Sequence, residues 1–409
     1  MIKLVDKIKK IDPVIYFSVI SAIGTIAFFI YAFFYNGVAM NWLVIENNST
    51  WELSDHFRQV GFGSDIAGVY MKDEPVACFP PLAYLFYNFL YNINPILADD
   101  NQWLFEALKL PYEAIMVIML FISISLLLFN VTFKILNVGI DKTTFFLLTV
   151  LFSVPFFGSA IERGNIIYLV LVILLFALYF KDSDKVWQRE LSLILIAIAA
   201  SFKITPAILG LLYLKEKRFK EAIRLVIYGI IFFFVPFIFC GGVDGFFAFL
   251  NVLSQQVTDI PDRWSCISGF IYYTFLYERI FGAKTITKIV QILFLVVMLI
   301  CTIITKKKWK ETMYLTYILA FLSSTNYRYT LIYLFIPLVF LIKDIRNSLD
   351  LDNDFDYFAL TVFALIFTIP TWWLIGNVEH WACGVSYLLG IICIVFEFID
   401  FLKEKKQLH

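Results

Sequence analysis

Long apolar runs recur along this chain and constrain its fold more than any other feature. A predominantly apolar run of about 20 residues crosses the hydrocarbon layer of a bilayer as an α-helix. Several such runs separate short charged segments in the 409-residue sequence, in which 61% of residues are hydrophobic and 16% charged. That is more apolar side chain than a soluble core of this length buries. The chain is therefore predicted to be an all-α polytopic membrane protein.

About ten segments are apolar enough to be membrane helices. They are predicted near residues 14–35, 111–133, 143–160, 165–180, 221–241, 286–304, 311–323, 329–342, 357–376 and 382–402. The first run follows basic residues, as in a signal peptide, but its length predicts that it stays as a membrane helix.

Lysine and arginine, which concentrate in cytoplasmic loops, indicate the orientation. Lysines precede the first run and follow the last one: Lys3, Lys7, Lys9 and Lys10, then Lys403, Lys405 and Lys406. Both termini are therefore predicted to be cytoplasmic. The segment 36–110 then lies outside, and its nine acidic against three basic residues agree with that side. Because long loops are seldom without function, 36–110 is the predicted catalytic loop.

The apolar segment 190–214 does not fit a single crossing, because lysines and arginines both precede and follow it. In its middle, Lys203 costs about 2.5–3.5 kcal/mol at mid-depth, and Pro206 interrupts the backbone hydrogen bonds. We predict two half-length helices that form a hairpin within the membrane, with Lys203 at the floor of a cavity. The following stretch, 242–285, is predicted to be an outer loop of interfacial helices, with five aromatic residues at the surface: Phe246, Phe247, Phe249, Tyr272 and Tyr273.

The remaining composition indicates one transmembrane domain over residues 1–409, without internal repeats. The six cysteines lack C-x-x-C spacing and the three histidines are scattered, so we expect no metal and no cofactor. The D-x-D spacing within Asp350–Asp356 is interpreted as a solvated linker that begins the next helix. Basic and acidic residues both number 33, so net charge gives no reason to expect a nucleic-acid partner.

Asp55 is the candidate general base of the outer loop. A carboxylate near the membrane surface, where water is partly excluded, can accept the proton of an attacking hydroxyl. The alternative is that Asp55 caps a short helix. His56 and Tyr70 lie in the same loop and are candidate substrate-binding residues.

Two turns between apolar runs combine polar and cationic side chains. The first contains Glu162, Arg163 and Asn165, and the second contains Asn326, Arg328 and Tyr329; all six are candidate substrate-binding residues. Because the guanidinium fork matches phosphate oxygens, we predict that Arg163, Arg328 and Lys203 converge on one phosphate group. The alternative is that each arginine lies at the interface or pairs with Glu162 or Glu379.

In their order along the chain, these motifs resemble the C-type (GT-C) integral membrane glycosyltransferases. The resemblance rests on Asp55, Phe79-Pro80-Pro81-Leu82, Glu162-Arg163-Gly164-Asn165 and Lys203-Ile204-Thr205-Pro206, and covers roughly residues 14–345. Within that class the sequence is most similar to glycosyltransferase family 87, which includes polyprenyl-phosphate-mannose-dependent mannosyltransferases.

The resemblance implies a GT-C-like fold and an inverting transfer of a hexose, such as mannose, or of a pentose. The donor would be a polyprenyl-phosphate-linked sugar, and the acceptor a glycan, glycolipid or other cell-envelope molecule. Asp55 matches the family's catalytic base, and membrane lipid is the further partner. Richness in Ile, Phe and Lys indicates a bacterial cytoplasmic membrane, with the active site facing outside.

Two alternatives remain at the level of the sequence. A transporter or flippase of lipid-linked sugars also needs buried cations, but inverted repeats and ionisable pairs near the midplane would be expected of it. A polymerase or ligase of surface polysaccharides is the second alternative and belongs to the same chemical class as the transferase.

Overall fold

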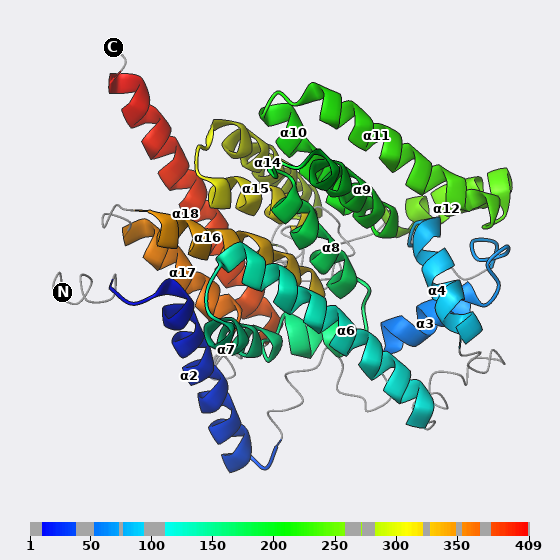
Figure 1. Cartoon of the computed structure of the whole chain (residues 1–409), viewed down its shortest axis with the longest axis horizontal. Helices are drawn as coiled ribbons and strands as arrows, with labels where there is room; N and C mark the ends of the chain where they lie inside the picture. Colours follow the sequence, from blue (N-terminus) through cyan, green and yellow to red (C-terminus); the bar gives the residue numbers. More distant parts are fainter. Residues whose placement is uncertain are drawn as a thin grey trace. The chain divides into compact units, whose positions relative to one another are not determined.

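The computed structural model describes residues 10–37, 53–72, 77–93, 111–257, 271, 283–321, 328–348, 354–368 and 378–407. Every regular element in these ranges is a helix, which confirms the predicted all-α class (Figure 1). The chain packs as two compact units. Unit 1 comprises Met1–Asn47, Thr132–Ser159 and Ile260–His409, and unit 2 comprises Asn48–Val131 and Ala160–Asp259.

The helices divide between the two units. Those of unit 1 are α2 (Pro13–Phe34), α7 (Ile140–Leu151), α14 (Ala283–Ile304), α15 (Lys308–Phe321), the 3₁₀ helix Arg328–Leu334, α16 (Phe335–Asn347), α17 (Asp354–Ile366) and α18 (Val378–Gln407). Those of unit 2 are α3 (Ser54–Gly63), α4 (Pro81–Ile93), most of α6 (Pro111–Leu136), α8 (Ile167–Phe180), α9 (Val186–Phe202), the 3₁₀ helix Thr205–Gly210, α10 (Leu211–Lys215), α11 (Phe219–Phe234), the 3₁₀ helix Val235–Ile238 and α12 (Gly242–Val257).

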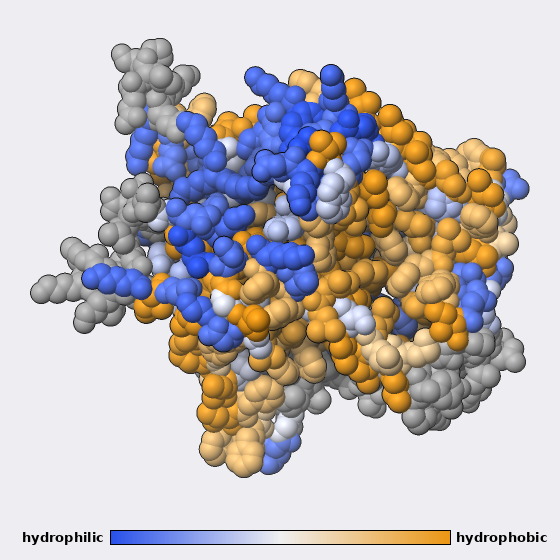
Figure 2. Space-filling view, viewed as in Figure 1, coloured by the Kyte–Doolittle hydropathy of each residue, from blue (hydrophilic) through white to orange (hydrophobic). Residues whose placement is uncertain are grey.

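Five helical segments among the described residues are long and apolar enough to cross a membrane. They are Pro13–Phe34, Ile115–Leu136, Phe219–Ile238, Thr285–Ile304 and Cys383–Lys403. Each coincides with a segment that the hydropathy of the sequence predicts. Figure 2 shows hydrophobic residues over the visible faces of α2, α6 and α11, as expected for helices in contact with lipid. These helices indicate an integral membrane protein. The predicted number of about ten spans and the predicted orientation stay predictions.

Two other helices, α8 and α15, are shorter than a membrane span and are largely surrounded by protein. α8 has 14 residues and buries most of them, and every residue of α15 from Trp309 to Phe321 is buried. An apolar helix of this length is typical of a core helix rather than of a lipid-exposed span. Hydropathy alone does not separate the two cases.

The predicted span 143–160 is wrong in its extent. α7 ends at Leu151, and a π-helix from Phe156 to Ile161 follows after a turn. Pro155 lies in that turn, and proline both lacks a backbone N–H and clashes with the carbonyl four residues earlier. One straight helix across this stretch is therefore excluded.

In unit 1, α2 and α17 approach closely near the end of α17. The Ser21 hydroxyl donates to the Phe367 carbonyl at 2.9 Å, and the Thr368 hydroxyl donates to the Ser21 carbonyl at 3.1 Å. A Cβ atom at Gly24 would lie 2.1 Å from Thr368 Oγ1. Glycine at this position is what lets the two backbones come together.

In unit 2, the chain turns back after α9. Arg218, which follows α10, donates from Nη2 to the Lys181 carbonyl at 3.0 Å, and its Nη1 lies 3.0 Å from Asp182 Oδ1. Lys181 also pairs with Glu216. The basic residues that precede α9 therefore lie near those that follow α10, at one end of the pair that these two helices form. Lys203 lies at the turn between the two helices.

A buried ion pair joins α15 to α18 in unit 1. Lys310 Nζ lies 2.8 Å from Glu397 Oε2, and both side chains are buried. The Tyr314 hydroxyl donates to the same carboxylate oxygen at 3.3 Å. Desolvating two charges is expensive, so such a pair persists only when its partners satisfy each other.

Removing one partner of this pair should therefore destabilise the protein more than removing both. Lys310→Met leaves the Glu397 carboxylate buried without its cation, which costs about 3–5 kcal/mol. The double variant Lys310→Met with Glu397→Leu leaves no uncompensated charge and should recover part of that loss. Apparent melting temperatures in detergent measure both effects. A double variant less stable than Lys310→Met would contradict this account.

Candidate functional site

The site begins where α3 meets the turn at residues 162–165, both in unit 2. The N–H of Leu53 donates to the Glu162 carbonyl, and the N–H groups of Asp55 and His56 donate to the Arg163 carbonyl at 3.0 and 3.3 Å. The N-cap residue of α3 is Leu53, which is in the left-handed conformation and has an apolar side chain that cannot cap the helix. The turn therefore satisfies N–H groups that a helix leaves open at its start.

Both oxygens of the Asp55 carboxylate accept hydrogen bonds from that same turn. Arg163 Nη2 lies 3.0 Å from Oδ1, and Asn165 Nδ2 lies 2.8 Å from Oδ2. The predicted alternative, that Asp55 caps a helix, is wrong, since its side chain points to the turn instead of its own helix. A carboxylate offers about four acceptor positions, so two stay available to other donors. The Asp55 side chain retains 18% exposure, whereas that of Arg163 retains 4%.

Asn165 is held in turn by the start of α8. Its Oδ1 accepts the N–H of Ile167 at 3.0 Å, and its own backbone N–H donates to the Ala160 carbonyl. With the amide oxygen engaged in this way, the amide nitrogen faces Asp55. The side chain is almost fully buried. Asn165 thus links the start of α8 to the Asp55 carboxylate and holds the two at a fixed separation.

Gly164 allows the turn to lie this close to α3. Its φ angle is +64°, which L-residues with a side chain rarely adopt. A Cβ atom there would lie 2.7 Å from the Cβ of His56 and 3.2 Å from Leu53 Cδ2. Glycine is therefore required both by the backbone conformation and by the space.

Lys203 lies at the turn after α9, half-buried and within electrostatic reach of Asp55. The preceding residue, Phe202, packs edge-on against Phe86 of α4 with ring centroids 5.7 Å apart. α4 also packs on α3 through the Tyr84 hydroxyl, which donates to Gln59 Oε1 at 2.8 Å. These contacts bring Lys203, Asp55, Arg163 and Asn165 into one neighbourhood of unit 2.

His56 and Tyr70 are buried beside these residues. The ring of His56 packs against Phe57 and Tyr87, and burial lowers its pKa to about 4, so the imidazole is neutral at pH 7. The Tyr70 hydroxyl donates to the Phe79 carbonyl at 2.7 Å, and its ring lies 5.2 Å from that of Phe249. Both side chains hold the local fold, and their predicted contact with substrate stays a prediction.

Phe249 was predicted to lie at the surface of the outer loop, and that prediction is wrong. It is fully buried on α12, where it packs against Tyr70 and Phe237. The neighbouring Phe247, predicted to lie at the surface as well, is strongly exposed, and Tyr272 and Tyr273 lie outside the described residues. α12 is therefore amphipathic, and the burial of Phe249 depends on partners distant in sequence.

The second predicted turn is only partly described. Asn326 lies outside the described residues, and Arg328 begins the 3₁₀ helix Arg328–Leu334 with its side chain outside the description. Tyr329 is buried in unit 1. The predicted convergence of Arg328 with Arg163 and Lys203 stays a prediction.

The chain that forms this site also matches a family model. Residues 80–327, more than half of the sequence, match glycosyltransferase family 87. The chain belongs to glycosyltransferase family 87. No curated protein and no solved structure matches it.

Membership of family 87 excludes one of the two alternatives that the sequence left open. The protein is a glycosyltransferase, which sets aside the transporter and flippase interpretations. The matched range contains Arg163, Asn165 and Lys203 and begins after Asp55. The ion pair between Asp55 and Arg163 therefore connects the candidate base to the part of the transferase that carries the family match.

Replacing Gly164 should disturb the site through α3. Gly164→Ala requires a strained φ angle and a shift of His56 or Leu53, at a cost of about 1–3 kcal/mol. Transferase activity should fall, because the carbonyl groups of Glu162 and Arg163, which accept the first N–H groups of α3, move with the turn. The matched control is Gly229→Ala in α11, where a Cβ atom meets nothing within 4 Å. Equal melting temperatures and activities for the two variants would contradict the requirement for glycine.

His56 should make stability depend on pH. Its pKa is about 4 in the folded protein and 6.5 as a free side chain, so the unfolded chain binds the additional proton between these values. Stability is therefore lost as pH falls from 6.5 towards 4, by up to about 3 kcal/mol. The variant His56→Gln should lose less stability over that window, as measured by melting temperature against pH. Parallel curves for the two proteins would refute the burial of a neutral imidazole.

Proposed function

We propose that this family 87 enzyme transfers a hexose or pentose from a polyprenyl-phosphate sugar to a cell-envelope acceptor, with Asp55 as general base. The observation that carries the proposal is the Asp55 carboxylate, fixed on both oxygens by Arg163 and Asn165 yet partly exposed. A base must be held in place and still reach the proton that it removes. Asp55 meets both conditions.

The proposed reaction is a single displacement. The acceptor hydroxyl oxygen attacks the anomeric carbon while the bond from that carbon to the phosphate oxygen breaks. The hydroxyl proton passes to Asp55, and the bonding electrons leave with the polyprenyl phosphate. Attack from the side opposite the leaving group inverts the anomeric configuration, so a β-linked donor gives an α-linked product.

The leaving phosphate gains a negative charge, which requires a cation nearby. Lys203 is within electrostatic reach of Asp55 and is therefore assigned to this phosphate. Cationic groups in a site that excludes water stabilise developing charge strongly. Arg328 is the further candidate for this role, from the second turn of the sequence.

The proposed location follows from the same reasoning. The segment 36–110, which carries Asp55, contains three basic residues, and this scarcity of lysine and arginine fits the face of a bacterial cytoplasmic membrane that is opposite the cytoplasm. The acceptor, a glycan or glycolipid, would meet the donor there.

Asp55→Asn should lower turnover by about 10²–10⁴-fold, because asparagine keeps the shape of the side chain and cannot accept the proton. The measurement is release of polyprenyl phosphate from synthetic polyprenyl-phosphate sugars by the reconstituted enzyme with an acceptor panel. Asp65→Asn is the matched control: Asp65 lies in the same segment and, among the described residues, accepts a local bond from the Gly68 N–H. It should retain activity.

The outcomes separate the parts of the proposal. Asp55→Asn with wild-type turnover and a wild-type melting temperature would refute the base. Turnover of nucleotide-linked sugars, with none of the polyprenyl-phosphate sugars, would refute the donor class. Both results leave the family assignment intact.

A further inference from the structure

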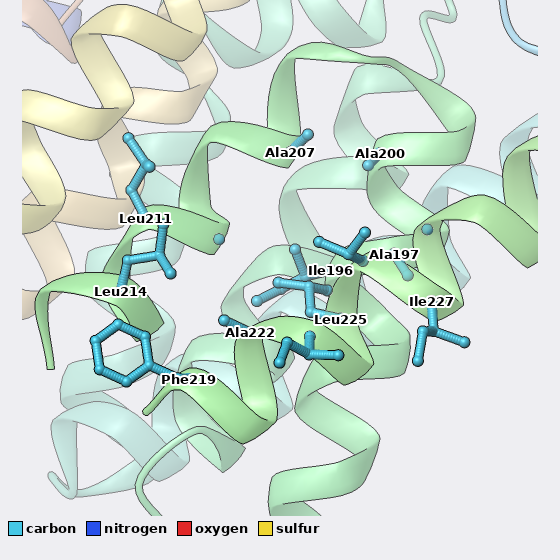
Figure 3. Close-up of a pocket in the computed structure, with 14 residues that line it drawn as sticks. Ile196, Ala197, Ala200, Ala207, Leu211, Leu214, Phe219, Ala222, Leu225 and Ile227 are labelled. Carbon is cyan, nitrogen blue, oxygen red and sulfur yellow. The ribbon is translucent and has the colours of Figure 1, made fainter. Parts of the chain in front are cut away.

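An apolar groove in unit 2 lies between α9, the 3₁₀ helix with α10, and α11 (Figure 3). Its volume is about 550 Å³, and its lining consists of aliphatic side chains, one phenylalanine, alanines and glycines. Leu214 and Phe219 line it at the charged end of the hairpin, and Ala200 and Ala207 line it near the turn that carries Lys203. The volume falls within the usual range for pockets that hold organic ligands.

One wall of the groove is a helix that is long and apolar enough to cross a membrane. α11 forms this wall, and it belongs to the candidate span Phe219–Ile238. Its groove residues Phe219, Ile223 and Val226 are all more than half exposed. From Phe219 to Gly229 the wall extends about 15 Å, at 1.5 Å per residue. A narrow apolar groove of that length along a membrane helix suits a single acyl chain.

Basic residues near Leu214 and Phe219, at one end of the groove, indicate the charge of the part of the ligand that lies outside it. Four cations there form ion pairs with acidic residues: Lys181 with Glu216, Arg218 with Glu221, Arg189 with Glu221, and Arg224 with Glu190. Lys217 and Lys220 are exposed, and neither pairs with an acidic residue in the part of the chain that the structure describes. Figure 2 shows a hydrophilic area around the place of α10 in Figure 1, next to the hydrophobic surface of α11.

The two lysines are placed to act together with the groove. They flank Arg218 and Phe219 in the chain, and Phe219 is itself a groove residue. Excess positive charge at the end of an apolar groove complements a molecule with an anionic head and a long apolar chain. A neutral lipid would leave these charges uncompensated, and a free phosphate would leave the groove without an occupant.

We propose that this groove binds one acyl chain of an anionic phospholipid whose phosphate lies between Lys217 and Lys220. This site is separate from Asp55 and independent of the donor that the enzyme uses. Its occupant contacts the hairpin on both sides of Lys203, through Ala200 and Ala207, and so braces the turn that positions this cation. Anionic lipid is thereby a structural partner of the transferase.

The test measures lipid selectivity in nanodiscs of phosphatidylcholine that contain spin-labelled phosphatidylglycerol or spin-labelled phosphatidylcholine. Wild-type protein should immobilise the anionic lipid several-fold more strongly than the zwitterionic one. Lys217→Gln with Lys220→Gln should bring this ratio close to one. Lys185→Gln removes an exposed cation of the same charged end that is not adjacent in the chain to any groove residue, and should reduce the ratio less than Lys220→Gln does.

A second pair of variants tests the groove itself. Ala207→Trp fills it and should lower the immobilised fraction of both lipids, whereas Ile230→Trp, on the exposed surface of α11 outside the groove, should not. Absence of headgroup selectivity in the wild type, or equal effects of Lys185→Gln and Lys220→Gln, would overturn the headgroup site. A change of oligomeric state in Ala207→Trp, with unchanged lipid immobilisation, would assign the groove to a helix of a second copy and overturn the lipid proposal.

Discussion

The contact between the start of α3 and the turn at residues 162–165 determines the arrangement of unit 2 around the candidate base. Backbone N–H groups of α3 donate to carbonyls of the turn, and side chains of the turn donate to Asp55. Either set alone would leave freedom of rotation or translation between the two segments. Together they fix the carboxylate in both orientation and position, and Gly164 provides the space that this requires.

From this contact, a continuous series of packed elements leads to Lys203. α3 packs on α4 through Tyr84 and Gln59, and also at Gly63, where a Cβ atom would lie 2.8 Å from the Asn88 nitrogen. α4 then contacts the end of α9 through Phe86 and Phe202. Lys203 follows directly. A cation next to a break in helical structure is costly in a membrane unless protein surrounds it, and these helices supply that surrounding.

Sequence reasoning succeeded where the controlling physics is local. α2, α6 and α14 were predicted within three residues of their observed ranges, because an apolar run of one span length leaves few alternatives. It failed at α7, where apolar residues continue beyond Leu151 but Pro155 ends the regular hydrogen bonding. It also failed at Phe249, because burial of one aromatic face depends on residues far along the chain.

The site shows the same division. The residue types and their order were accessible from sequence and led to the family, but the partner of Arg163 was not. Asp55 and Arg163 are 108 positions apart, and nothing in the spacing distinguishes an arginine that binds a phosphate from one that binds a carboxylate. The glycine between Arg163 and Asn165 was the one local sign that this turn needs a special backbone conformation and lies close to another segment.

The pairing of Arg163 with Asp55 bears on how charge moves in the proposed reaction. Before transfer, the guanidinium is compensated by the carboxylate, and the donor phosphate carries a single negative charge. When Asp55 takes the acceptor's proton it becomes neutral, and at the same moment the leaving phosphate gains a second negative charge. The positive charge of Arg163 is then uncompensated just when a new anion forms within the same site. An interaction that strengthens only along the reaction path lowers the barrier, whereas one already complete in the ground state does not. Arg163 can therefore pair with Asp55 before the transfer and still help to stabilise the phosphate. Once Asp55 is protonated and neutral, the positive charge of Arg163 is no longer compensated by the carboxylate.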